Sequence, residues 1–128
     1  MTTPPISPRV LQFIAEKIDT VAELETLLIM SDDEHRQWSE QEVAARLYTT
    51  PAAATRVLDS LVRRELITAE GKPARFRFNP ARSEDRKLFA EVAEAYRRNL
   101  VAITTFIHSK ASASVQDFAR AFDLKKDQ

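Results

Sequence analysis

Cysteine is absent from this chain of 128 residues, and glycine occurs once, at Gly71. Without thiols, neither disulfide bonds nor thiolate metal sites can form. A single glycine excludes the glycine-rich loops that cradle nucleotide phosphates. No apolar stretch approaches the roughly 18 residues of a membrane-spanning helix, and residues 1–10 lack the apolar core of a signal peptide. We therefore expect a cytoplasmic protein that has no membrane partner.

Few residues are candidates for catalysis or metal binding. The two histidines, His35 and His108, fall in separate predicted elements. His35 ends the acidic run of residues 32–35, which we assign to a solvated loop rather than to a metal site, because acids are unfavourable at a helix C-terminus. No serine–histidine or paired-carboxylate arrangement can be placed in one pocket. The sequence thus predicts a protein that is not an enzyme and has no cofactor, no metal and no catalytic residues.

Two helix start signals stand close together in the middle of the chain. Ser39 and Glu42 have the spacing of a capping box. Thr50 is a second N-cap, and Pro51 follows it at the first helical position. Apolar residues recur behind both signals at helical spacing. Only Tyr48 and Thr49 separate the two predicted helices, so we expect a tight turn between them.

A short hairpin is predicted directly after these helices. Residues 66–68 are apolar and β-prone, and residues 70–73 have the composition of a turn, in which Gly71 can take a positive φ. Arginine and phenylalanine then alternate over residues 75–78, and Asn79 and Pro80 end the strand. Because alternate residues of a strand face opposite sides, we expect two phenylalanines to be buried and two arginines to be exposed.

This order of elements resembles the winged-helix superfamily of bacterial regulators, including its MarR-like and ArsR-like groups. The resemblance rests on the run SEQEVAARLYTTPAAATRVLDSLVRRELI and covers roughly the central third to half of the chain. It implies a mainly α fold with a small β-hairpin, in which residues 51–64 form a recognition helix and residues 70–75 the tip of a wing. The alternative is a plain helical hairpin with a surface β-hairpin attached.

The resemblance implies a DNA-binding transcription regulator whose partner is double-stranded DNA. On the exposed arc of the predicted recognition helix, Arg56 can donate to guanine and Thr55 can contact a thymine methyl or a phosphate. The remaining candidates are polar or basic residues of the helix and wing that can hold phosphates. The full set of predicted DNA-binding residues is Thr55, Arg56, Ser60, Arg63, Lys72, Arg75 and Arg77.

Charge leaves a second function open. The net charge is zero, and Asp59 lies on the same predicted arc, which disfavours a strongly basic DNA-binding surface. Acids exceed bases in residues 1–49, whereas bases exceed acids in residues 50–128, so the positive half can face DNA or pair with another copy. In the alternative function, the same helix contacts a protein partner, and Ala52 and Ala53 permit close approach.

The flanking segments are predicted to be helical. Pro8 and Thr20 open two N-terminal helices, and Ser83 opens a long C-terminal helix that runs to about Ser109 and is about 40 Å long. We divide the chain into a winged-helix domain with its N-terminal helices, residues 1–82, and a C-terminal part, residues 83–128, that packs on the same domain and on a dimer mate. A short helix is expected over residues 114–124.

The long C-terminal helix carries a spacing of four, three, four, three and four between apolar residues, which is the seam of a coiled coil. Helices at the ends of winged-helix regulators commonly pair, so the sequence predicts a homodimer. The alternative is that this stripe packs on the chain's own core. The predicted interface residues are Phe89, Ala93, Tyr96, Leu100, Ile103 and Ile107.

Overall fold

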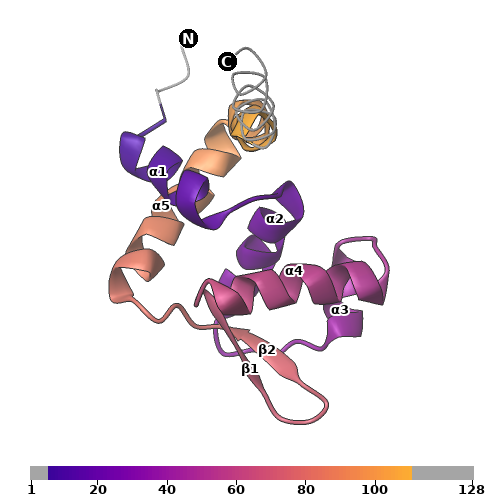
Figure 1. Ribbon diagram of the computed structural model, residues 1–128. Helices are drawn as coiled ribbons and strands as arrows, with labels where there is room; N and C mark the ends of the chain where they lie inside the picture. Colours follow the sequence, from indigo (N-terminus) through magenta and orange to yellow (C-terminus); the bar gives the residue numbers. More distant parts are fainter. Residues whose placement is uncertain (1–5, 111–128) are drawn as a thin grey trace, which may run out of the picture.

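Helices and one hairpin follow each other in the order expected of a winged helix (Figure 1). The structure is a computed structural model and describes residues 6–110. Its named elements are α1 (Pro8–Lys17), α2 (Val21–Ser31), α3 (Glu40–Arg46), α4 (Pro51–Arg63), β1 (Ile67–Glu70), β2 (Arg75–Phe78) and α5 (Ser83–Arg98). Residues 100–110 form a further helix. The predicted fold class, mainly α with a small antiparallel hairpin, is confirmed.

The start signals of α3 and α4 work as the sequence predicts. The Ser39 hydroxyl accepts a hydrogen bond from the Glu42 N–H at 3.1 Å, and the Glu42 carboxylate accepts one from the Ser39 N–H at 3.0 Å. The Thr50 hydroxyl accepts from the Ala53 N–H at 3.1 Å, and Pro51 occupies the first turn. Each bond satisfies an N–H that has no partner within its helix. These caps fix the starts of α3 and α4 at the positions that the sequence predicts.

Both helices of the helix-turn-helix end in the same way. The residue after each C-cap, Tyr48 for α3 and Glu65 for α4, has left-handed backbone, with φ of 54° and 61°. The hydrogen bonds of both ends are those of a Schellman motif. They run from Tyr48 N–H to Ala45 O (3.3 Å), Thr49 N–H to Ala44 O (3.0 Å), Glu65 N–H to Val62 O (3.0 Å) and Leu66 N–H to Leu61 O (3.1 Å).

The hairpin is tied to the helices on both sides. Its register pairs Ile67 with Phe78, and Gly71 at its turn has a φ of 81°. Trp38 exchanges two backbone hydrogen bonds of 2.8 Å with Phe76 and so adds a bridge on the outer side of β2. β1 begins one residue later than predicted and continues to Glu70, because the Leu66 N–H is used by the end of α4.

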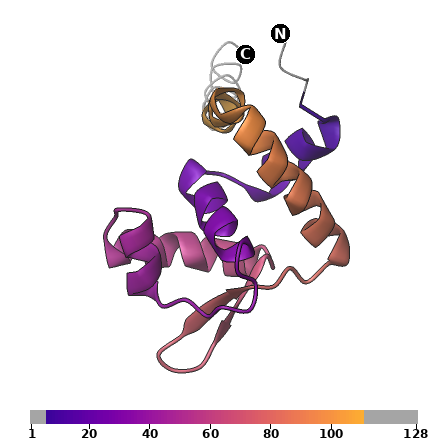
Figure 2. The ribbon, with the colours of Figure 1, turned by 180° about the vertical axis from the view of Figure 1, so that it is seen from behind.

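The core is one cluster of apolar side chains to which every named element contributes. Three tilted rings join distant segments in it: Phe89 of α5 lies 6.3 Å from Phe13 of α1 and 5.7 Å from Phe78 of β2, centroid to centroid. Figures 1 and 2 show α1 and α5 side by side at the end of the molecule opposite the hairpin, with α2 between them and α4. The predicted burial of Phe76 and Phe78 is confirmed, at 3% exposure each.

The prediction of one continuous C-terminal helix is wrong. The helix breaks at Asn99, whose φ of −133° and ψ of 49° are not helical. Its N–H donates to the Ala95 carbonyl at 2.8 Å, and its carbonyl accepts from the Ile103 N–H at 3.0 Å, so Asn99 ends one helix and begins the next. Asparagine is a poor helix-interior residue, because its short amide competes for backbone groups. Because the apolar spacing continues through residue 99, the sequence pattern gave no sign of the break.

Most residues of the predicted dimer seam are not available to a second copy. Five of its six residues are buried in their own chain: Phe89, Ala93, Tyr96, Ile103 and Ile107. Only Leu100 is exposed, at 52%, and its neighbour Val101 is 75% exposed. The stripe thus packs on the chain's own core, which was the alternative to a coiled-coil seam.

The C-terminal end of α1 is held by two cations from distant elements. The Lys110 ammonium donates to the Ile14 and Ile18 carbonyls at 3.2 and 2.7 Å, and the Arg64 guanidinium donates to the Glu16 carbonyl at 2.9 Å. Both cations also bind the Asp19 carboxylate. Cations at a helix C-terminus are stabilising. This cluster therefore ties both the helix of residues 100–110 and the end of α4 to the C-terminal end of α1.

None of the helices described between residues 6 and 110 combines the length and apolar character needed to cross a membrane.

Candidate nucleic-acid interface

The outward face of α4 carries two exposed cations. Ala54, Leu58 and Leu61 turn into the core, which leaves Arg56 and Arg63 exposed at helical spacing. Within residues 6–110, neither guanidinium has an ion pair or a side-chain hydrogen bond. Both are therefore available to an anion that approaches α4 from outside.

Two other predicted contacts on α4 are already engaged. The Thr55 hydroxyl donates to the Pro51 carbonyl of its own helix at 2.9 Å. Ser60 is half-buried and its hydroxyl donates to the Glu23 carboxylate of α2 at 3.3 Å. Because Glu23 is only 5% exposed, it needs such a donor. Ser60 thus lies at the α2–α4 contact, away from the outward arc on which it was predicted.

Two of the three predicted cations of the wing, Arg75 and Arg77, are paired with carboxylates. Lys72 is exposed in the turn between the strands. Arg75 is exposed and lies 3.6 Å from the Glu42 carboxylate, whereas Arg77 is half-buried and lies 3.1 Å from that of Glu70. The predicted exposure of the arginines thus holds for Arg75 and only in part for Arg77. Both arginines are thus ion-paired within their own chain.

The Glu42 carboxylate interacts with two arginines, Arg36 and Arg75. The Ser39 N–H and the Arg36 guanidinium, at 2.8 Å, hold the pKa of its carboxyl at about 2. Hydrogen bonds to the charged form are the principal cause of such a shift. Glu42 therefore stays ionised at neutral pH, where it caps α3 and also attracts Arg75 of the wing.

Sequence reasoning missed two exposed groups beside α4. The Arg46 side chain at the end of α3 is exposed and lies 5.5 Å from the Trp38 ring centroid, above which Arg36 stacks at 3.6 Å. Tyr48, in the turn that leads into α4, is 97% exposed. Its place in the turn was clear from the sequence, but an aromatic residue between two helices gives no sign of whether it packs inward or points out.

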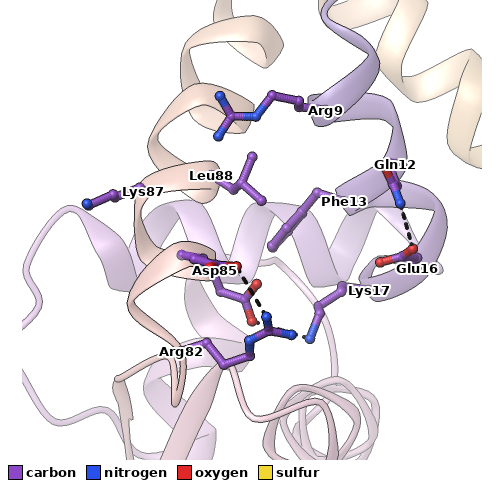
Figure 3. A pocket seen from close by; sticks show the side chains of 10 residues that line it. Arg9, Gln12, Phe13, Glu16, Lys17, Arg82, Asp85, Lys87 and Leu88 are labelled. Atoms are coloured by element: carbon purple, nitrogen blue, oxygen red, sulfur yellow. Dashed lines mark hydrogen bonds and ion pairs between the residues drawn. The ribbon is translucent and has the colours of Figure 1, made fainter.

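A cavity of about 360 Å³ lies between α1 and the start of α5 (Figure 3). Its charged groups are largely paired with one another: Lys17 with Asp85 at 3.3 Å, and Arg82 with Glu84 at 3.2 Å. The Gln12 amide donates to the Glu16 carboxylate at 3.1 Å. In the described part of the chain, no cluster of three or more His, Cys, Asp or Glu side chains is arranged to hold a metal ion. In this cavity three of the four cations are ion-paired, whereas Arg56 and Arg63 on α4 have no ion pair within residues 6–110.

Solved structures with a similar fold include known regulators. A MarR family protein from Bacillus stearothermophilus is 14% identical, with 94% of this chain and 84% of that chain covered and a TM-score of 0.53. The M. tuberculosis transcriptional regulator MosR is 18% identical, with 91% and 83% covered and a TM-score of 0.55. A MepR–DNA complex from S. aureus is 14% identical, with 94% and 90% covered and a TM-score of 0.53. At these identities the likeness establishes the fold. No protein-family model and no curated protein sequence matches this chain.

Proposed function

We propose that this protein is a transcription regulator that binds double-stranded DNA by inserting α4 into the major groove. The observation that carries the proposal is the pair of exposed guanidiniums of Arg56 and Arg63 on the outward face of α4, which have no ion pair within residues 6–110. Support also comes from the fold, since one similar structure is that of a protein in complex with DNA. In helix-turn-helix proteins the second helix is the one that enters the groove.

Arg56 is the base-reading residue in this proposal. It lies in the second turn of α4, close enough to the helix N-terminus to reach base edges, where a guanidinium can bind guanine through two hydrogen bonds. Thr55 offers its methyl group, since its hydroxyl is bonded within the helix. Arg63, near the C-terminal end of α4, is assigned to a phosphate.

The wing supplies phosphate contacts. Lys72 is free to bind at once, and Arg75 and Arg77 bind when a phosphate displaces the carboxylates of Glu42 and Glu70. Exposed ion pairs of this kind contribute only about 0.2–1 kcal/mol, so the exchange is inexpensive. Ser60 is no longer part of the interface, because its hydroxyl serves Glu23.

Asp59 constrains how α4 can lie in the groove. It is exposed between Arg56 and Arg63, and its carboxylate is repelled by phosphates. A carboxylate can, however, accept a hydrogen bond from the N4 amino group of cytosine. We therefore place Asp59 beside Arg56 toward base edges, and Arg63 toward a phosphate.

We propose in addition that the regulator acts as a homodimer. Leu100 and Val101 are adjacent apolar residues with exposures of 52% and 75%, and they follow the break at Asn99. Covering them would bury apolar surface, which favours association. Leu100, the exposed residue of the predicted stripe, and its neighbour Val101 are the centre of the proposed interface.

The test is a mobility shift of the full chain against fragmented genomic DNA at two salt concentrations, with the variant Arg56→Ala. Arg98→Ala is the matched control, because it removes the same charge from α5, where Arg98 pairs with Glu94. We expect the parent and the control to retard the same fragments, and Arg56→Ala to lose the preference among fragments by about 1–3 kcal/mol. Absence of any retarded fragment at low salt would contradict the proposal and favour a protein partner for this face.

A further inference from the structure

Tyr48 is the most exposed large apolar side chain in the described part of the molecule, at 97%. It also has a φ of 54°, a left-handed backbone conformation that bulky residues rarely adopt. The residue after the C-cap in a Schellman motif is usually glycine, because glycine has no Cβ to clash there. Tyrosine at this position thus contributes no core packing and opposes its own backbone preference.

An aromatic ring that is almost fully exposed on left-handed backbone is available to a partner outside the chain. Glu65 occupies the equivalent position at the end of α4, with the same pair of backbone hydrogen bonds and a φ of 61°. It is also exposed, but it follows α4, whereas Tyr48 precedes it. Both residues have left-handed backbone, but Tyr48 lies at the N-terminal end of α4 and Glu65 at its C-terminal end.

Tyr48 stands at the end of α4 that the proposed function directs to DNA. It comes two residues before Thr50, the N-cap of α4, and Thr49 and Thr50 beside it are exposed as well. Figure 1 shows the α3–α4 turn at one end of α4 and the hairpin leaving from the other. With α4 in the groove, the turn and the wing meet the sugar–phosphate backbone on either side of it.

We propose that Tyr48 binds the sugar–phosphate backbone of duplex DNA: its phenolic hydroxyl donates to a phosphate oxygen, and its ring lies against the adjacent sugar. This inference rests on the proposed DNA-binding function and adds a contact that fixes the register of α4 in the groove. Tyrosine hydroxyls are among the groups that contact phosphates in protein–DNA complexes, and such contacts carry no sequence information. The proposed contact gives the exposed ring a binding partner.

The experiment compares Tyr48→Gly with the matched control Glu65→Gly, both as full chains. Urea unfolding measures stability, and fluorescence anisotropy measures binding to a pool of short random-sequence duplexes at two salt concentrations. Both variants should unfold at higher urea than the parent, because glycine removes the left-handed strain. Only Tyr48→Gly should bind the pool more weakly, by about tenfold, as expected for the loss of a hydrogen bond to a charged group.

A third variant and the salt dependence of binding test the contact further. Tyr48→Phe keeps the ring and the backbone strain, so it should lose only the hydroxyl's share of binding and leave stability unchanged. The dependence of affinity on salt should be the same for Tyr48→Gly as for the parent, because tyrosine releases no counterion. A salt slope that falls by one unit would overturn the assignment of a neutral contact.

The possible failures are distinguishable. If the parent binds the pool and Tyr48→Gly binds it equally well, the role of Tyr48 is overturned while DNA binding stands. If Glu65→Gly weakens binding as much as Tyr48→Gly, the effect belongs to the shared backbone motif, and the inference is likewise overturned. If the parent does not bind the pool even at low salt, the proposed function itself fails.

Discussion

Replacing Phe78 with alanine would remove the ring that joins the wing to the helices. Phe78 ends β2 and is 3% exposed. Its ring lies 5.7 Å from that of Phe89, which in turn lies 6.3 Å from Phe13. The Arg86 guanidinium lies 5.5 Å from the centroid of the Phe78 ring and covers it from the α5 side. The substitution therefore opens a cavity where β2, α5 and α1 meet.

The expected loss of stability is large for a protein of this size. Truncation of a buried phenylalanine to alanine costs about 3–5 kcal/mol, which includes the cavity left behind. The tilted pair with Phe89 accounts for about 0.5–1.5 kcal/mol of that. Since domains are stable by about 5–15 kcal/mol in total, Phe78→Ala should lose at least about a fifth of the free energy of unfolding. The midpoint of thermal unfolding should fall by about 10–20 °C.

Urea unfolding followed by circular dichroism measures this difference, with Phe106→Ala as the matched control. Phe106 is only partly buried at the edge of the core, so its truncation should cost less than about 2 kcal/mol. A loss below about 1 kcal/mol for Phe78→Ala, or a loss no larger than that of Phe106→Ala, would refute the placement of the wing strand against α5.

Three further substitutions test other contacts. Leu100→Asp should convert the proposed dimer to a monomer, because it places an unpaired charge in the interface; light scattering that gives a monomer mass for the parent would contradict this. The pKa of the Asp19 carboxyl is lowered from 3.8, chiefly by the hydrogen bond from Lys110, so its ionised form stabilises the fold above that pH and the contribution is lost as pH falls through the folded-state pKa. Asp19→Asn should therefore be less stable than the parent at neutral pH, with a difference that shrinks below about pH 4 in acid titrations; a constant difference would argue against this role. Ser60→Ala should lower stability by about 1 kcal/mol in urea, because Glu23 loses a donor, while DNA affinity stays unchanged; weaker binding would return Ser60 to the interface.

Local signals account for the part of the fold that the sequence predicted. The capping box of Ser39 and Glu42, the N-cap Thr50 and the alternation of residues 75–78 each depend on residues within one turn or one strand. Such interactions form in the same way whatever the rest of the chain does. The boundaries of α3, α4 and β2 could therefore be read with little error.

The errors came where a distant partner decides the outcome. Ser60 was placed on the exposed arc of the predicted recognition helix, but it is half-buried and its hydroxyl donates to a buried carboxylate on α2. The stripe from Phe89 to Ile107 has the spacing of a coiled coil, and yet Asn99 bends it back onto the chain's own core. The pairing of Arg75 and Arg77 with carboxylates also depends on tertiary placement. Apolar spacing alone cannot tell a self-packing stripe from a dimer seam.

The central claim is that the outward face of α4 and the wing together bind duplex DNA. The most direct measurement is chemical-shift mapping of the ¹⁵N-labelled full chain during titration with a duplex recovered from the mobility shift. The account predicts that the largest changes fall on amides of residues 48–63 and 70–75, with the Arg56 and Arg63 side-chain signals among them. Changes centred on α1 and α5, or none at low salt, would contradict it.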